Sequence, residues 1–313
     1  VMNVLPGEAG YPAEIEITLP ENMLAIPFGS SEAEVVAEHG DGTRTWRYEH
    51  NGAGGILYAG DYIREDIEAG GMTIQFYYGR KHQAVMEAAK AVDAVKEVVD
   101  YCTEHYGSLS FGAGETLKLI QSRVAGGGYA TTGASLLDEA DFTAANLRNT
   151  EKGGGAGEVM IHELVHQWWG LGNMFESEDY NDEWSSEGLT VYTTYRLMKE
   201  LHGEEYAVEN YVKLWEKTVE EYNNNFYVRH PEYLEKLPEK YRVEIANSLS
   251  GIKHYSLMPL KILKAEKLVG GEEKMDEILA SLFQGETNPS YPYLTYEAFL
   301  DACGLSKEDL NLE

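Results

Sequence analysis

Cysteine is nearly absent from the chain, with only Cys102 and Cys303 among 313 residues. Neither belongs to a C-x-x-C pair, so the sequence excludes a zinc site built from cysteine sulfur. Two isolated cysteines do not indicate a redox compartment.

Long apolar runs are also missing. The longest stretch without a charged residue or histidine, Val124 to Leu137, is shorter than the ~18–20 apolar residues that span a bilayer. No signal peptide is visible, and the chain begins at Val1 rather than methionine. We therefore expect no direct membrane insertion and a mature product or fragment, whose parent protein carries further domains. An extracytoplasmic domain of a membrane-tethered parent is the expected location, with the cytoplasm as the alternative.

Basic residues are scarce, because 25 lysines and arginines face 53 aspartates and glutamates, for a formal net charge of −28. Nucleic acids and anionic membrane surfaces need a basic patch, so neither is expected as a partner. The charge is compatible with cationic substrates, although a solvated acidic surface is the simpler interpretation. With 43% hydrophobic and 25% charged residues, the composition indicates a soluble globular protein with room for two domains.

The stretch Val159-Met-Ile-His-Glu-Leu-Val-His-Gln-Trp-Trp-Gly170 contains an H-E-x-x-H pattern. On a helix, His162 and His166 lie one turn apart on the same face, where both imidazoles can reach one metal ion, with Glu163 beside them. Two nitrogen ligands and a carboxylate that takes a proton from the attacking water suit zinc. A chance pentapeptide with surface histidines is the alternative.

The first 80 residues alternate apolar and polar residues between turn sequences. This alternation predicts antiparallel strands at 13–19, 23–28, 43–48 and 72–78. From residue 81 the apolar residues recur at three- and four-residue steps, which predicts one helix over 81–106, ended by Gly107. A domain boundary near residue 80 follows.

Most of the remaining chain is expected to be helical. A strand is expected at 116–124, and helices at 182–201, 204–222, 259–269, 273–283 and 296–303. Pro259 suits the first turn of its helix, so Tyr255 falls just before that helix or in its opening turn. Trp168 and Trp169 are predicted to pack in the core rather than to contact substrate.

The segment Ala125-Gly-Gly-Gly-Tyr-Ala-Thr-Thr-Gly133 is rich in glycine but lacks the lysine of a phosphate-binding loop. It predicts either a glycine-rich turn or a strand edge onto which an extended peptide can hydrogen-bond. The residues alone favour neither.

A catalytic zinc site usually has three protein ligands and one open position. The three-histidine pattern fails because position 172 is glycine, so a glutamate is the remaining common solution. The candidates are Glu176, Glu178, Glu183 and Glu187, and spacing does not choose among them. Asp182 or Glu183 is also a candidate hydrogen-bond partner of a ligating histidine.

Two motifs together resemble the gluzincin metallopeptidases of the aminopeptidase N and leukotriene hydrolase type. They are His162-Glu163-x-x-His166-Gln167-Trp168-Trp169-Gly170 and Asn181-Asp-x-Trp184-x-x-Glu187-Gly188. The resemblance implies Glu187 as the third zinc ligand. The loop between the motifs is two residues longer than in the family, which loops tolerate at small cost, and Ser186 replaces the family asparagine.

Two further segments carry the resemblance. Tyr255, with a leucine-rich helix and Gly270 after it, resembles the segment whose tyrosine stabilises the tetrahedral intermediate in the family. The family's E-K-G after this tyrosine is replaced by Ser256-Leu257-Met258. Upstream, Ala59-Gly-Asp-Tyr62 resembles the end of the family's N-terminal β domain.

Gly127-Gly-Tyr-Ala-Thr131 aligns with the G-x-M-E-N motif on the family's substrate-binding strand. The resemblance implies that Gly127, Gly128 and Tyr129 bind substrate. Ala130, however, stands where the family's exopeptidases have the glutamate that holds the substrate's free α-amino group. Most of the family's N-terminal β domain and its C-terminal helical domain are missing from this chain.

The resemblance implies an α+β fold, with residues 1–80 as the C-terminal part of a β-sheet domain and residues 81–313 as a thermolysin-like, mostly α catalytic domain. It implies one Zn²⁺, held by His162, His166 and Glu187, with Glu163 as general base and Tyr255 as oxyanion donor. The expected function is zinc-dependent, aminopeptidase-like hydrolysis of peptide substrates. The alternatives are a zinc endopeptidase or restricted-substrate peptidase, as Ala130 suggests, and a non-catalytic peptide-binding domain.

Overall fold

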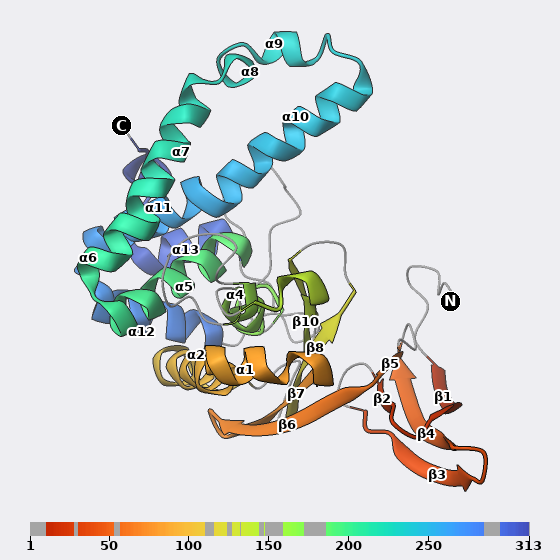
Figure 1. The fold of residues 1–313 in the computed structure, drawn as a ribbon. Helices are drawn as coiled ribbons and strands as arrows, with labels where there is room; N and C mark the ends of the chain where they lie inside the picture. Colours follow the sequence, from red (N-terminus) through yellow and green to blue (C-terminus); the bar gives the residue numbers. More distant parts are fainter. Residues whose placement is uncertain are drawn as a thin grey trace.

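The computed structural model describes residues 11–27, 31–52, 57–109, 116–123, 127–131, 133–143, 147, 159–171, 186–284 and 295–312. Two small antiparallel sheets lie at the N-terminal end of this part (Figure 1). In the first, β4 (Thr43–Gly52) pairs with β1 (Tyr11–Pro20) and β3 (Glu34–His39), and in the second β2 (Leu24–Pro27) pairs with β5 (Leu57–Gly60). In β1, half-buried Ile15, Ile17 and Leu19 alternate with exposed polar residues, as the period-two pattern predicts. Phe28, the last residue of one predicted strand, lies outside the described residues.

A five-stranded mixed sheet supports the rest of the molecule. Its order is β6 (Tyr62–Ala69), β7 (Met72–Gly79), β8 (Thr116–Ser122), β10 (Ala134–Asp138) and β9 (Gly128–Thr131). The predicted antiparallel pairing holds for β7 with β6, but β7 also pairs in parallel with β8. This hydrogen-bonded sheet continues across residue 80, where the sequence predicts a domain boundary, and the division into two domains stays a prediction.

The predicted helix over 81–106 is broken, which corrects the sequence analysis. A 3₁₀ turn (Arg80–His82) leads into α1 (Gln83–Ala89), and α2 (Ala91–Tyr106) follows after one residue. Lys90 separates the two helices because it adopts left-handed backbone angles, with φ of 49°. Apolar spacing continues through this point without a glycine or proline, so the pattern does not reveal the break. The predicted end of α2 at Gly107 is confirmed, with φ of 108°.

Helices α2 and α4 (Val159–Val165) pack against the five-stranded sheet, and α5 (Ser186–His202) packs against α4. The main core lies between the sheet and these helices. Trp168 and Trp169 are fully buried in this core, as predicted. The predicted helix over 204–222 comprises α6 (Glu204–Ala207), a π-helical turn (Val208–Val212) and α7 (Lys213–Asn224).

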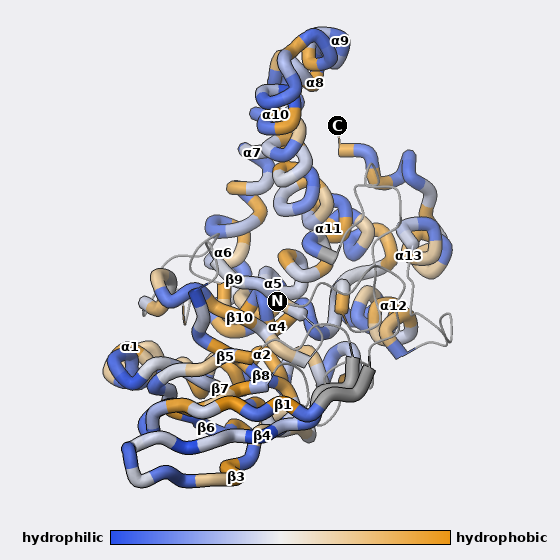
Figure 2. Tube along the Cα trace, turned by 90° about the vertical axis from the view of Figure 1, so that its right-hand side faces the viewer, coloured by the Kyte–Doolittle hydropathy of each residue, from blue (hydrophilic) through white to orange (hydrophobic). Residues whose placement is uncertain are grey.

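A helical hairpin projects from the body of the molecule (Figure 1). It runs up α7, through α8 (Phe226–Arg229) and α9 (Pro231–Leu234), and returns along α10 (Glu239–Ile252). Figure 2 shows the hairpin extending away from the sheet, with hydrophilic and hydrophobic residues intermixed along it. Helices α8, α9 and α10 have no buried residue, so they lack the one-sided apolar pattern on which sequence prediction depends.

The chain passes from α10 through a π-helical turn (Lys253–Leu257) into α11 (Met258–Val269), so Tyr255 lies just before the helix that contains Pro259. The remaining helices are α12 (Glu272–Gln284), α13 (Tyr296–Cys303) and a 3₁₀ turn (Glu308–Leu310). In the described part of the chain, no helix has both the length and the apolar character needed to cross a bilayer.

Candidate metal centre and active site

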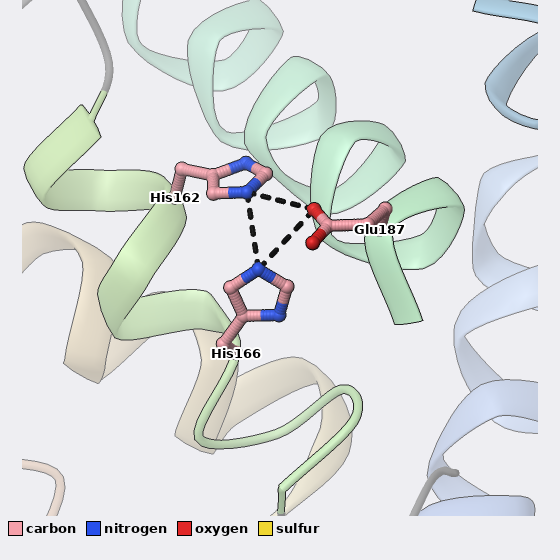
Figure 3. Close-up of side chains that lie close together, drawn as sticks. All are labelled: His162, His166 and Glu187. Atoms are coloured by element: carbon pink, nitrogen blue, oxygen red, sulfur yellow. Dashed lines mark hydrogen bonds and ion pairs between the residues drawn. The ribbon is translucent and has the colours of Figure 1, made fainter. Parts of the chain in front are cut away.

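Side chains from two helices converge at one point (Figure 3). His162 lies on α4, His166 follows in the turn that ends this helix, and Glu187 lies in the first described turn of α5. Nε2 of His162 is 3.0 Å from Oε2 of Glu187 and 3.1 Å from Nε2 of His166, which is itself 3.3 Å from the same oxygen. The structure therefore brings together the three residues predicted to hold zinc, and their role as ligands stays a prediction.

The donor set and its spacing fit zinc. Bonds of about 2.0–2.1 Å to a tetrahedral zinc ion place neighbouring ligand atoms about 3.3 Å apart. The three separations, from 3.0 to 3.3 Å, lie close to this value. Two imidazoles, one carboxylate and a side open to a pocket are the arrangement of a catalytic rather than a structural zinc site.

The hydrogen bonds of Nδ1 of His166 determine which ring nitrogen is available to a metal. Nδ1 lies 3.1 Å from the backbone carbonyl oxygen of Trp169 and 3.2 Å from Oγ1 of Thr190. A carbonyl oxygen only accepts, so Nδ1 must carry a proton and donate it. Nε2 of the neutral ring is then left with its lone pair facing His162 and Glu187, as a metal ligand requires.

Burial and hydrogen bonds separate the pKa values of the three groups. Burial lowers the pKa of His162. Burial alone would raise the pKa of Glu187, but the hydrogen bonds with His162 and His166 hold this pKa well below the usual carboxyl range. Burial would lower the pKa of His166, yet the hydrogen bond with Glu187 leaves it raised. The site therefore keeps an ionised carboxylate between two imidazoles, which favours a bound cation.

Glu163 lies next to this group and is buried. Burial raises its pKa to about 7, partly offset by the charge of His166 and by a hydrogen bond from the backbone N–H of Ala130. A carboxyl group with a pKa near neutrality can both accept and release a proton at physiological pH, which general acid–base chemistry needs. Glu163 therefore has the environment of the predicted general base.

A pocket of about 240 Å³ joins these residues to two other elements. Tyr255, in the π-helical turn before α11, is half-exposed, and its ring centroid is 6.0 Å from that of His162. The predicted oxyanion donor thus shares the pocket with the metal centre. The residues that line the pocket are Gly128, Tyr129, Ala130, His162, Glu163, His166, Gly170, Leu171, Glu187 and Tyr255.

Strand β9 forms one wall of the pocket and is the edge strand of the five-stranded sheet. The described part of the glycine-rich segment therefore contains a strand at the sheet edge, as one of the two interpretations predicted, while peptide binding to that edge stays a prediction. Of the predicted substrate-binding residues, Gly128 and Tyr129 line the pocket. Gly127 lies just before the strand, and its carbonyl accepts a hydrogen bond from the backbone N–H of Asp138 at 2.8 Å. Binding of substrate by these residues stays a prediction.

Several residues that support the site do not stand out in the sequence. Gln167, in the turn that ends α4, ties this helix to the sheet edge, because its side-chain amide donates to the carbonyl of Thr131 at 3.0 Å and accepts from the N–H of Gly133 at 3.2 Å. Thr190 and the Trp169 carbonyl hold His166. The spacing of Thr190 from Glu187 was a usable signal, because residues three apart share a helix face.

Other predicted residues lie outside the described part of the chain. These are the alternative ligands Glu176, Glu178 and Glu183, and the proposed histidine partner Asp182. Their predictions are not tested by the structure.

Comparison with known proteins places the site in a family context. The profile of the peptidase family M1 domain matches residues 90–283, more than half of the chain. Leucine aminopeptidase 2 of Emericella nidulans is 28% identical over 142 residues, which cover 44% of this chain and 22% of that protein. Leukotriene A-4 hydrolase of Xenopus laevis is 27% identical over 148 residues, which cover 46% of this chain and 24% of that protein. The matched part thus makes up about a quarter of each relative's length.

The fold is similar to that of an M1 zinc metallopeptidase from Deinococcus radiodurans. The TM-score is 0.55, with 17% sequence identity, over 96% of this chain and 63% of that one. At 17% sequence identity, this similarity shows the fold alone.

Proposed function

Because the chain belongs to peptidase family M1, we propose that it is a zinc-dependent metallopeptidase that hydrolyses peptide bonds. The observation that carries the proposal is the convergence of His162, His166 and Glu187 beside Glu163 in one pocket. Three converging metal-binding side chains, of which His166 is buried and the other two are partly buried, and a carboxylate with a pKa near 7 are more than a peptide-binding surface needs. A non-catalytic binding domain is therefore the weaker interpretation.

Each residue has a distinct role in the proposed reaction. His162, His166 and Glu187 hold one zinc ion, which supplies Lewis-acid chemistry. Glu163 accepts the proton of the attacking water and delivers it to the leaving amine. Tyr255 donates its O–H to the oxygen that becomes negatively charged as the carbonyl is attacked. The edge of β9 binds the substrate backbone by strand addition.

For the substrate, we propose aminopeptidase-like cleavage, which the relatives named aminopeptidase support. A second candidate, an endopeptidase or a peptidase of restricted substrate, is favoured by Ala130. Its methyl group cannot bind an amine, and its backbone N–H already serves Glu163. Among the described residues that line the pocket, the carboxylates are Glu163 and Glu187, both assigned to other tasks.

One experiment separates these functions. The purified chain is incubated with a peptide that has a free amino terminus and with the same peptide acetylated. Cleavage of the free peptide alone supports an aminopeptidase, and cleavage of both supports an endopeptidase. In parallel, Glu163→Gln should retain zinc and lose hydrolysis, because it removes the base and leaves the three metal ligands. Unchanged turnover in that variant would exclude the proposed mechanism.

A further inference from the structure

Trp169 links the hydrophobic core to the metal centre. Its indole is fully buried, with ring centroids 4.8 Å from Tyr106 and 5.7 Å from Phe283, both in edge-on contact. Its backbone carbonyl accepts the Nδ1 proton of His166 at 3.1 Å. The side chain and the carbonyl belong to one residue, so the orientation of the carbonyl depends on how the indole is held.

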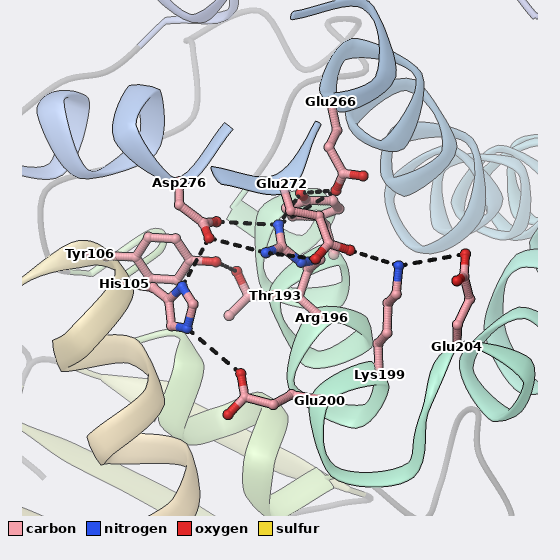
Figure 4. Close-up of polar contacts among 11 residues, drawn as sticks. His105, Tyr106, Thr193, Arg196, Lys199, Glu200, Glu204, Glu266, Glu272 and Asp276 are labelled. Atoms are coloured by element: carbon pink, nitrogen blue, oxygen red, sulfur yellow. Dashed lines mark hydrogen bonds and ion pairs between the residues drawn. The ribbon is translucent and has the colours of Figure 1, made fainter. Parts of the chain in front are cut away.

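The indole is held by a hydrogen bond to α5. Its Nε1–H donates to Oγ1 of Thr193 at 2.7 Å. The same hydroxyl donates onward to the hydroxyl of Tyr106 at 3.5 Å, and Figure 4 shows these two residues facing each other. All three side chains are buried. A buried N–H without an acceptor is strongly unfavourable, so the Thr193 hydroxyl selects the position of the indole.

Helix α5 thus reaches the metal centre by three routes. Glu187, Thr190 and Thr193 follow one another at three-residue steps, so they lie along one side of the helix. Glu187 faces the two histidines, Thr190 contacts Nδ1 of His166, and Thr193 holds Trp169. Arg196, further along α5, anchors the helix to Asp276 of α12 through contacts of 3.0 and 3.2 Å (Figure 4).

We propose that Thr193 is a positioning residue for the metal ligand His166 and acts on it through Trp169. The hydroxyl of Thr193 fixes the indole, the indole fixes the backbone of Trp169, and the Trp169 carbonyl orients the imidazole and keeps the proton on Nδ1. The inference rests on the proposed function, because it takes His166 to be a zinc ligand. The side of α5 that faces the core then contributes to metal affinity as well as to stability.

The test measures the zinc dissociation constant of the full chain by competition with a chelator. Outer partners of metal-bound histidines typically change metal affinity about 10–100-fold, so Thr193→Val should weaken zinc binding about tenfold, at the lower end because it acts through one more residue. Thr193→Ser keeps the hydroxyl and should bind zinc within about twofold of the wild type, since both make the same hydrogen bond.

Thr194→Val is the matched control. Thr194 is equally buried on the same helix, but its hydroxyl donates to the carbonyl of Thr190 within α5, at 2.9 Å. If Thr193 served stability alone, both valine variants would lose thermal stability. The two folded proteins would then bind zinc with the same affinity. Equal zinc affinities in the two variants would overturn the proposal.

Trp169→Phe gives an independent measurement that does not depend on folding of Thr193→Val. It removes the indole N–H and should weaken zinc binding by a similar factor. In the double variant the two losses should not add, because each removes the same hydrogen bond. Additive losses would overturn the proposal. The visible spectrum of the cobalt-substituted protein should also change in both single variants and remain that of the wild type in Thr193→Ser. A wild-type chain that binds no zinc would instead reject the proposed function itself.

Discussion

Gly128 lies directly against the side chain of Glu163. A Cβ atom at position 128 would lie 2.3 Å from Cγ of Glu163 and 2.7 Å from its Cδ and Oε1 atoms. Atoms do not approach so closely, so Glu163 occupies its position only because residue 128 is a glycine. The edge strand therefore sets the position of the proposed general base as well as that of the proposed substrate-binding residues.

Gly128→Ala should lower kcat/KM about a hundredfold, because a displacement of about 1 Å in a catalytic group can cost that much. Zinc content should not change, since the three atoms nearest to the added methyl group all belong to Glu163, which is not one of the three proposed ligands. Gly251→Ala on α10 is the control, because a Cβ there meets nothing within 4 Å and alanine favours a helix. Wild-type turnover in Gly128→Ala, measured on a fluorogenic peptide, would mean that Glu163 is not held as described.

A second glycine sets the spacing of two helices behind the metal centre. A Cβ at Gly188 would lie 2.2 Å from Cγ and 2.8 Å from Cβ of Met258, which is fully buried on α11. Gly188→Ala should therefore reduce the free energy of unfolding by about 1–3 kcal/mol, as overpacked cores do. Urea denaturation checks this value. Met258→Ala creates space at the same point, so the double variant should lose less than the sum of the two single losses, and a strictly additive result would contradict the contact.

Arg196 is a buried charge that connects three helices. Its guanidinium contacts the hydroxyl of Tyr192 at 2.8 Å. It also contacts Asp276 at 3.0 Å and Glu266 at 3.5 Å (Figure 4). Arg196→Met removes the buried positive charge beside these carboxylates, and removing one member of a buried pair typically costs about 3–5 kcal/mol. Lys199→Met is the control, since Lys199 on the same helix is more exposed and its pairs should contribute at most about 1 kcal/mol. Similar urea midpoints for the two variants would contradict a special role for Arg196.

His105 should make stability depend on pH. Its Nδ1 lies 2.9 Å from Asp276, and this hydrogen bond raises the pKa of His105 in the folded protein. A histidine with a raised pKa stabilises the fold fully below its unfolded pKa of about 6.5, and this contribution disappears as pH rises through the folded pKa. The difference in unfolding free energy between wild type and His105→Gln should therefore be larger at pH 5.5 than at pH 9. A difference that is equal or larger at pH 9 would contradict a raised pKa of His105 in the folded protein.

Much of the site can be predicted from local sequence. His162 and His166 are four residues apart, which is about one helical turn. On a helix this spacing places both side chains on the same face and close together. Glu187 could not be selected by spacing alone, because the fold of the intervening segment decides which of four glutamates reaches the histidines. The resemblance to known metallopeptidases supplied that information, and the structure places Glu187 at 3.0 Å from His162.

The contacts that sequence reasoning missed depend on tertiary structure. Gln167 reaches the sheet edge and Thr193 reaches Trp169 only because α4, α5 and β9 pack together. The break at Lys90 leaves no trace in the apolar pattern, and α10 exposes most of its surface, so its periodicity is weak. In each case the deciding interaction joins residues far apart in sequence or depends on one backbone torsion angle.

Zinc reconstitution tests the central claim most directly. The chain is stripped with a chelator, and peptide hydrolysis is measured as zinc is returned in known amounts. Activity should be lost on stripping, rise linearly with added zinc, and reach its plateau at one zinc per chain, with no recovery in Glu187→Gln. Hydrolysis that persists without zinc, or a Glu187→Gln variant that binds zinc and cleaves like the wild type, would contradict the account.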